Sequence, residues 1–425
     1  MQNIHIRKTC GSLLCTKGST KIKVHGKEKF MLEKNINFGE VIERKNTNCL
    51  KYDFVKERNM PEDVLPLWVA DMDFKVSSYI QEQLKKQIEH GIFGYSDSKE
   101  SYFQAVYSWI KEHYNWEIKE KWIVKTPGIV FALAMAVKAF TNKGDCVLIQ
   151  QPVYYPFFQV IEKNQRIVIN NPLVQVEDGS YNMDMKDFEE KIVQNNVKLF
   201  FLCNPHNPVG RVWKKEELEQ IGDICYKHNV IVVSDEIHAD FIFKGKHQVF
   251  ANVKKEYEQN SIVCTSPSKT FNLAGLQISN ILIPNEELRN KFKQEIEACG
   301  YSQPNVMGII ACEAAYKYGN EWYQAMHQYI KENIQFTKEY IEKNIPQIKI
   351  KEPEGTYLVW LDFRNFQLSE EQLEDLITNK AKLWLDGGTM FGEDGKGFQR
   401  INVACQRATL EKALNQLKDA IDEIK

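Results

Sequence analysis

The stretch Ser266-Pro267-Ser268-Lys269-Thr270-Phe271-Asn272 organises the rest of this chain. It follows the apolar run Ser261 to Thr265, whose length and β-branched residues are typical of a buried parallel strand. Ligands of open α/β sheets bind at the carboxyl ends of the strands, which is where Lys269 is expected to lie. Most lysines that follow a strand are simply solvated, so this stretch alone does not establish a site.

Two upstream segments add polar side chains at predicted strand ends. They are Asn204-Pro205-His206-Asn207-Pro208 and Ser234-Asp235-Glu236-Ile237-His238, and each follows a buried apolar run. A lysine in such a place can form a Schiff base with an aldehyde cofactor, and serine hydroxyls such as those of Ser266 and Ser268 can bind a phosphate. A lysine, a carboxylate and an amide at strand ends are what pyridoxal phosphate requires.

The composition is that of a soluble globular enzyme. The chain has 425 residues, a hydrophobic fraction of 43% and a formal net charge of -2, which gives no electrostatic basis for binding nucleic acid or an anionic membrane. Its ten cysteines are scattered without CxxC pairs, which predicts reduced thiols and a cytoplasmic protein. Apolar stretches such as Phe131 to Phe140 are too short to span a membrane. We therefore expect a small-molecule substrate, no nucleic acid and no membrane.

Three segments of the chain together resemble the fold-type I aminotransferase superfamily, and within it the MalY/PatB type of cystathionine β-lyase. The segments are Trp68 to Phe74, Ser234 to His238 and Lys269 to Gln277. The resemblance runs from about Asn35 to the C-terminus. It implies an α/β fold in which helices sandwich a mostly parallel seven-stranded sheet in a large domain, with a smaller α+β domain beside it.

The resemblance also implies a division of the chain into parts. The expected parts are a disordered N-terminal extension (1–34), an N-terminal segment that packs with the small domain (35–75), the large cofactor-binding domain (76–318) and the small C-terminal α+β domain (319–425). Residues 1–30 are basic, but the run Ser12 to Cys15 is too brief for the core of a signal peptide. A weak targeting segment and an overlong start assignment stay open for this region.

The cofactor's phosphate is expected to lie against a turn that precedes a helix. A strand, the turn at Gly128 and a helix start with Ile129 and Val130 would direct free backbone N–H groups at an anion. A Pro-Gly step before a helix is usually only a turn, and it is the resemblance that implies a phosphate cradle here. The resemblance further implies that Tyr95 donates its hydroxyl to the phosphate of the neighbouring subunit, in a homodimer with shared active sites. The alternative for Tyr95 is an ordinary surface aromatic.

Four side chains are expected around the cofactor ring. The resemblance implies that Tyr154 stacks on the ring, Asn207 binds its phenolic oxygen, Asp235 pairs with its protonated nitrogen and His238 is a further hydrogen-bond partner near that oxygen. Core packing is the alternative for Tyr154. A helix cap or a metal ligand is the alternative for Asp235.

Four residues are expected to contact the substrate. A guanidinium matches an α-carboxylate bidentately, and the resemblance assigns that role to Arg400, for which a surface salt bridge is the alternative. It places Tyr155, Val69 and Ala70 near the substrate as well. The aspartates beside Ala70 could instead only cap the helix that follows them.

Two further observations concern metal binding and the choice between a lyase and an aminotransferase. The spacing of Cys203, His206 and His238 fits no recognised zinc site, so we expect no metal. Many aminotransferases carry a phosphate-binding arginine where this chain has Gln277, and the glutamine fits the lyase-type motif better.

The resulting hypothesis is a pyridoxal-phosphate-dependent cystathionine β-lyase. Lys269 would hold the cofactor and remove the Cα proton, after which a thiolate leaves Cβ and pyruvate and ammonia form. With L-cystathionine the thiol would be homocysteine. The alternatives are a class I/II aminotransferase, or a lyase with an additional regulatory protein-binding role. The sequence does not indicate which S-substituted cysteine is preferred.

Overall fold

The computed structural model describes residues 36–424. The N-terminal extension expected over residues 1–34 lies outside this range. Among residues 36–424, no helix is both long and apolar enough to cross a lipid bilayer.

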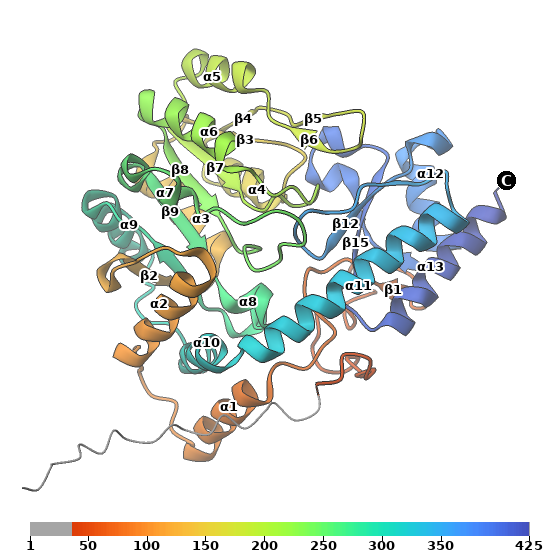
Figure 1. The fold of residues 1–425 in the computed structure, drawn as a ribbon, viewed down its shortest axis with the longest axis horizontal. Coiled ribbons are helices and arrows are strands. Elements are labelled where there is room, and N and C mark those ends of the chain that lie inside the picture. The colour runs from red at the N-terminus through yellow and green to blue at the C-terminus, as the bar shows by residue number, and fades with distance from the viewer. Residues whose placement is uncertain (1–35, 425) are drawn as a thin grey trace, which may run out of the picture.

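A seven-stranded sheet forms the centre of the larger part of the molecule (Figure 1). Its strands, in spatial order, are β2 (Ile123–Thr126), β10 (Ser279–Leu282), β9 (Ser261–Thr265), β8 (Ile231–Asp235), β7 (Leu199–Cys203), β3 (Cys146–Ile149) and β4 (Ile167–Asn170). Strand β10 is antiparallel to both of its neighbours, and the pairs from β9 to β4 are parallel. The prediction of a mostly parallel seven-stranded sheet is therefore confirmed.

Helices cover both faces of this sheet. They are α1 (Ser78–His90), α2 (Glu100–Tyr114), α3 (Ile129–Phe140), α4 (Pro156–Lys163), α5 (Met185–Gln194), α6 (Lys215–Lys227), α7 (Phe250–Val253), α8 (Pro267–Thr270), α9 (Glu286–Ala298) and α10 (Val306–Tyr318). Alternate residues of β7 enter different cores: Phe201 packs with α3, α4 and α9, whereas Phe200 packs with α5 and α6. Side chains alternate across a strand, so this strand is apolar throughout because it is buried on both faces.

A four-stranded antiparallel sheet lies in the smaller part of the molecule. Its strands, in spatial order, are β11 (Lys349–Ile350), β12 (Leu358–Asp362), β15 (Phe398–Asn402) and β14 (Asp386–Gly387). The helices α11 (Asn320–Asn344), α12 (Glu370–Asp375) and α13 (Arg407–Asp422) accompany it. Helix α11 has 25 residues, so it is about 37 Å long and runs from the larger part into the smaller one (Figure 1).

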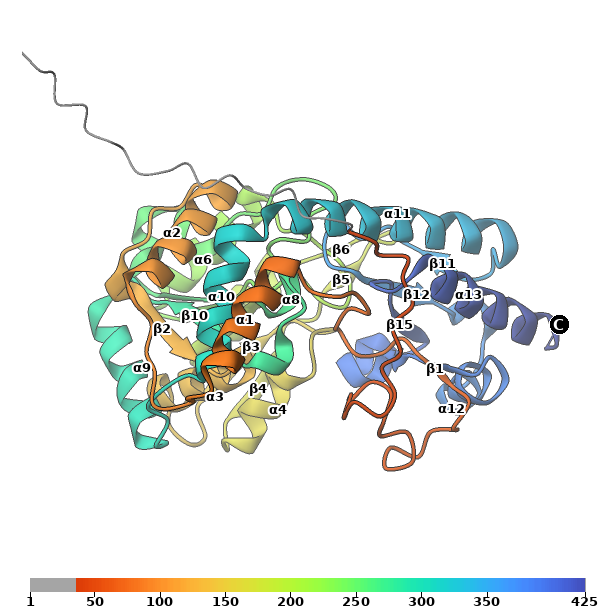
Figure 2. The ribbon, with the colours of Figure 1, turned by 90° about the horizontal axis from the view of Figure 1, so that it is seen from below.

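Residues 36–75 lie beside the C-terminal part of the chain (Figure 2). Strand β1 (Leu65–Pro66) pairs in parallel with β13 (Leu383–Trp384). The Asn402 side chain donates to the backbone oxygens of Val69 and Asp71 over 2.6 Å each. A further two-stranded ribbon joins β5 (Val174–Gln175) to β6 (Tyr181–Asn182).

Two aspartates anchor this segment through a buried ion-pair network. The Nζ of Lys51, which is 0% exposed, lies 2.8 Å from an oxygen of Asp73, and Arg44 lies 2.6 Å from Asp71. Arg44 also pairs with Asp73. The cap of α1 is Ser77, whose hydroxyl accepts from a backbone N–H over 3.3 Å. The alternative that the aspartates cap this helix is therefore wrong.

The substitution Lys51→Met should lower the free energy of unfolding by about 3 kcal/mol, because it removes one partner of a buried carboxylate. Lys75→Met is the matched control, since the pair of Lys75 with Glu40 is exposed and contributes little. Urea unfolding followed by fluorescence measures both variants. Equal midpoints for the two would show that the buried network does not stabilise the segment.

Candidate active site

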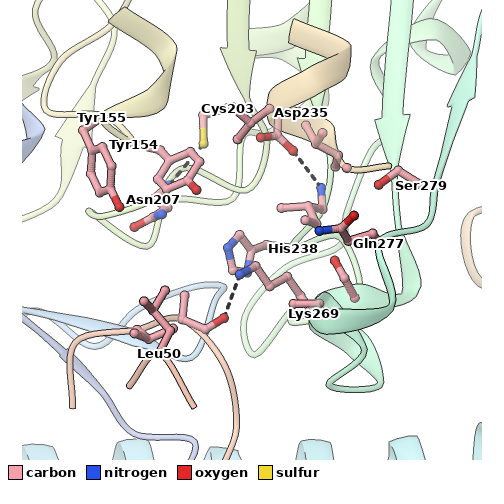
Figure 3. Close-up of a pocket in the computed structure, with 18 of the residues that line it drawn as sticks. Leu50, Tyr154, Tyr155, Cys203, Asn207, Asp235, His238, Lys269, Gln277 and Ser279 are labelled. Atoms are coloured by element: carbon pink, nitrogen blue, oxygen red, sulfur yellow. Dashed lines mark hydrogen bonds between the residues drawn. The ribbon is translucent and has the colours of Figure 1, made fainter. Parts of the chain in front are cut away.

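A cavity of about 300 Å³ opens where the strands of the large sheet end (Figure 3). Cys203 ends β7, Asp235 ends β8, and Lys269 lies on α8 just after β9. Arg400 comes from β15 of the smaller sheet. The cavity is lined by Leu50, Trp68, Val69, Ala70, Pro127, Gly128, Ile129, Val130, Tyr154, Tyr155, Cys203, Asn207, Asp235, Ile237, His238, Ser268, Lys269, Ala274, Gln277, Ile278, Ser279, Asp386 and Arg400.

Lys269 is held by a backbone oxygen of the N-terminal segment. Its Nζ donates to the oxygen of Ala70 over 2.7 Å, and the hydroxyl of Tyr357 donates to the same oxygen over 2.8 Å. Desolvation lowers the pKa of Lys269 to about 8, although Asp71 and Asp235 act in the opposite direction. A lysine with such a pKa is partly neutral near pH 8 and can act as a nucleophile or a base.

Asp235 and His238 are buried polar groups near Lys269. Desolvation raises the pKa of Asp235 to about 7, and its carboxylate accepts a hydrogen bond from the backbone N–H of Ile237 over 3.2 Å. Desolvation lowers the pKa of His238, so its imidazole is neutral. The Nδ1 atom of His238 has no hydrogen-bond partner within residues 36–424. Both side chains can therefore accept a polar ligand.

Arg400 joins three distant segments at the far wall of the cavity. One of its terminal nitrogens donates to Asn207 Oδ1 over 3.0 Å, and the other donates to the oxygen of Trp68 over 3.0 Å and pairs with Asp386. Its Nε has no partner in the described part of the chain. Arg400 is 3% exposed, so the surface salt bridge considered from the sequence is wrong. Burial raises the pKa of Asp386, and the charge of Arg400 opposes that effect.

Two tyrosines form one side of the cavity. Tyr154 and Tyr155 lie with their ring centroids 5.3 Å apart (Figure 3). The backbone N–H of Tyr154 donates to the oxygen of Asn207 over 3.1 Å, which links this side of the cavity to the end of β7. An aromatic face of this kind suits a flat heterocyclic ring.

The N-terminus of α3 faces the cavity from another side. Gly128 is its N-cap and provides no side-chain cap, so the backbone N–H groups that follow have no side-chain acceptor from the N-cap. Gly128, Ile129 and Val130 all line the cavity, as does Ser268. A helix N-terminus of this kind binds anions through its N–H groups and its dipole.

Two predicted site residues lie outside the cavity wall of their own chain. The Ser266 hydroxyl donates to the backbone oxygen of Ile278 over 2.8 Å and caps α8 by accepting from the N–H of Ser268 over 3.1 Å. Tyr95 is 98% exposed.

Sequence reasoning missed several residues of the cavity wall, among them Asp386 and Leu50. Asp386 reaches Arg400 because β14 pairs with β15 in a register that places the two opposite one another. Leu50 reaches the cavity from a stretch without a motif. For Asp386, the only sequence feature that could have indicated a site was its carboxylate in the short run Trp384-Leu385-Asp386. No sequence feature indicated Leu50.

A family model described as aminotransferase class I and II matches residues 62–417. The chain belongs to the class I and II aminotransferase family. Within this family it is similar to "Cystathionine beta-lyase PatB" of Bacillus subtilis, at 41% identity over 91% of this chain and 100% of that protein. It is also similar to "Protein MalY" of Escherichia coli, at 32% identity over 92% of this chain and 100% of that protein.

A solved member of the family has the same fold. The crystal structure of cystalysin from Treponema denticola, which contains pyridoxal 5'-phosphate, matches with a TM-score of 0.88 and 38% identity. The match covers 92% of this chain and 99% of the cystalysin chain. Both the family and the fold that the sequence resemblance implied are confirmed.

In protein freed of small molecules, Lys269 should react with an acylating reagent with a midpoint near pH 8, because desolvation lowers its pKa to about 8. Lys418 on α13 is the control, since a hydrogen bond to Asp422 raises its pKa and delays its reaction to higher pH. Mass spectrometry of peptides labelled over a pH series measures both lysines. Coinciding profiles would contradict the perturbed pKa of Lys269.

Proposed function

We propose that this protein is a pyridoxal-phosphate-dependent carbon–sulfur β-lyase of the cystathionine β-lyase type. It converts L-cystathionine or a related S-substituted cysteine into a thiol, pyruvate and ammonia. The observation that carries the proposal is the convergence of Lys269, Asp235 and Arg400 on one cavity, with a lysine whose pKa is lowered toward neutrality. The relatives named as cystathionine β-lyases support the reaction type.

The residues around the cavity fit pyridoxal phosphate. The uncapped N-terminus of α3, from Gly128 to Val130, and the hydroxyl of Ser268 would hold the phosphate. Tyr154 offers an aromatic face for the ring. Within residues 36–424 the Nδ1 of the neutral His238 has no hydrogen-bond partner, which supports a role for this buried imidazole in binding such a ligand.

Three other side chains complete the binding site that we propose. Asn207 and His238 would bind the phenolic oxygen, and Asp235 would pair with the ring nitrogen, where a positive charge favours the ionised carboxylate. Lys269 would carry the covalent link. When bound, the cofactor supplies an electron sink for the bonds to the substrate's Cα. Ser266 would act by capping the helix that carries Lys269 rather than by contacting the phosphate.

Arg400 would fix the substrate through its α-carboxylate. Its Nε is unpartnered among the described residues, and its terminal nitrogens already point at oxygen acceptors, so the guanidinium is held in one orientation. Val69, Ala70 and Tyr155 line the cavity beside it and would contact the rest of the substrate.

Once the substrate's amino group has displaced Lys269 from the cofactor, the freed amine of Lys269 would remove the proton from Cα. Its lowered pKa provides the neutral amine that this step needs near pH 8, and the hydrogen bond to the Ala70 oxygen is available to hold the ammonium that results. The leaving thiolate then departs from Cβ. A class I/II aminotransferase would use the same lysine, and Gln277 in place of a phosphate-binding arginine favours the lyase.

Purified protein supplied with L-cystathionine and no keto acid should release pyruvate and free thiol in equal amounts. Lys269→Ala should lower this rate by more than about a hundredfold, because the base is lost. Lys418→Ala, at an exposed position of α13, is the matched control and should retain the rate. Activity that emerges only after a keto acid is added would contradict the lyase and indicate an aminotransferase. A surface-mediated regulatory role would survive in Lys269→Ala.

We further propose a cytoplasmic homodimer with shared active sites that serves sulfur amino-acid metabolism, including methionine biosynthesis. Ile92, Phe93 and Tyr95 are 67%, 59% and 98% exposed, so an apolar segment of the described chain is uncovered. Tyr95 would reach the phosphate in the partner's cavity. We also propose that residues 76–318 are the large domain and that residues 319–425 form the small domain, with which the segment from residue 35 to 75 packs.

Coexpression of Lys269→Ala with Tyr95→Ala tests the shared site. Each heterodimer contains one site with both the intact lysine and the intact tyrosine, so the mixture should recover roughly a quarter of wild-type activity. Pyruvate release by the copurified mixture measures the recovery, and each variant expressed alone is the control. No recovery in a mixture shown to contain heterodimers would contradict the contribution of Tyr95 in trans.

A further inference from the structure

Trp68, on the cavity wall, is covered on both faces of its indole ring. Trp384 stacks on it with a centroid distance of 4.5 Å and an interplanar angle of 15°. The guanidinium carbon of Arg58 lies 4.7 Å from the centroid of the Trp68 ring. Because Trp384 occupies one face, Arg58 lies over the other.

Arg58 has no carboxylate partner within residues 36–424, where no ion pair or side-chain hydrogen bond of this arginine is found. Its side chain is exposed. A guanidinium that stacks on an aromatic ring keeps the N–H groups at its edge available for a carboxylate. Arg58 is therefore a positive charge that a cavity residue positions and that has no carboxylate partner among residues 36–424.

The charge of Arg58 affects the pKa values of two acidic groups of the site. Burial raises the pKa of Tyr155 and that of Asp386, and in both cases the charge of Arg58 acts in the opposite direction. Asp386 is already paired with Arg400 and is buried. Asp386 is therefore not the anion that neutralises Arg58, and the positive charge of Arg58 acts on these residues of the cavity wall.

Trp68, which Arg58 covers, lines the cavity together with the residues that would hold the substrate. Arg400 is buried and would hold the α-carboxylate at the inner wall, with Lys269 next to Cα. Leu50 lines the same cavity but is 49% exposed, so it marks a side on which the cavity meets solvent. Trp68 also lines the cavity, and Arg58 covers the face of its ring that Trp384 does not. A substituent that extended along Trp68 would approach the guanidinium.

We propose that Arg58 is a specificity-determining residue that binds a carboxylate at the far end of the substrate's sulfur substituent. The protein then prefers S-substituted cysteines whose substituent ends in an anionic group over those whose substituent is neutral. This inference rests on the proposed β-lyase function, and it narrows the substrate class of that site.

Two substrates with the same three-carbon chain on sulfur, one carboxylated and one neutral, test the inference: S-(2-carboxyethyl)-L-cysteine and S-propyl-L-cysteine. In the holoenzyme, Arg58→Gln should lower kcat/KM for the carboxylated substrate by about tenfold, chiefly through KM, because one charge-assisted contact is lost. The value for S-propyl-L-cysteine should stay within about twofold of wild type. Added salt should raise the wild-type KM for the carboxylated substrate and have less effect on the variant. Lys56→Gln is the matched control, since Lys56 is an exposed cation of the same segment that pairs with Glu62.

Equal losses for the two substrates in Arg58→Gln would overturn the inference, because Arg58 would then act only by supporting Trp68. Unchanged values for both substrates would overturn it as well. Release of no pyruvate from either substrate by the wild type would instead refute the β-lyase function. In that case the binding of the same two amino acids, measured from the absorbance of the bound cofactor, tests the role of Arg58. Tighter binding of the carboxylated amino acid by the wild type, with this preference lost in Arg58→Gln, would support the inference. Equal binding of the two amino acids by the wild type would overturn it.

Discussion

The guanidinium of Arg400 is the interaction on which the rest of the site depends. A buried cation must be compensated, and here the compensation comes from Asp386, the Asn207 side chain and the backbone oxygen of Trp68. These groups belong to the smaller sheet, the large sheet and the N-terminal segment. The same contacts that stabilise the charge therefore hold the three parts of the cavity in register.

Lys269, in the same cavity, shows a related constraint. Its ammonium and the hydroxyl of Tyr357 share the oxygen of Ala70, so the N-terminal segment again supplies the acceptor. Desolvation nevertheless prevails over Asp71 and Asp235 and lowers the pKa of the lysine, and desolvation also raises the pKa of Asp235. The lysine and the aspartate are thus each shifted toward their neutral forms, and shifts of this kind are common at functional sites.

Much of the fold and part of the site could be predicted from the sequence, for a physical reason. Strands buried on both faces are read from short apolar runs, and parallel strands bring their carboxyl ends to one edge, so Asn207, Asp235 and Lys269 could be placed together before any coordinates. Asp386 could not, because its contact with Arg400 depends on the register of β14 against β15. Ser266 was placed at the right turn, but which of two neighbouring hydroxyls faces the cavity depends on the local backbone. The network of Lys51 and Asp73 was missed because a pair of charges distant in sequence carries no periodic signal.

The contacts of Arg400 with three parts of the chain also determine when the cavity can form during synthesis. The segment that contributes the Trp68 oxygen leaves the ribosome early, and the large sheet follows, but β15 is the last strand of the chain. Until that strand emerges, the early segment has neither the Asn402 amide nor the Arg400 guanidinium to dock against. A nascent chain that stops short of β15 can build the large sheet and still lack a closed cavity, so a truncated product is unable to sequester a reactive aldehyde in the way that the full chain can.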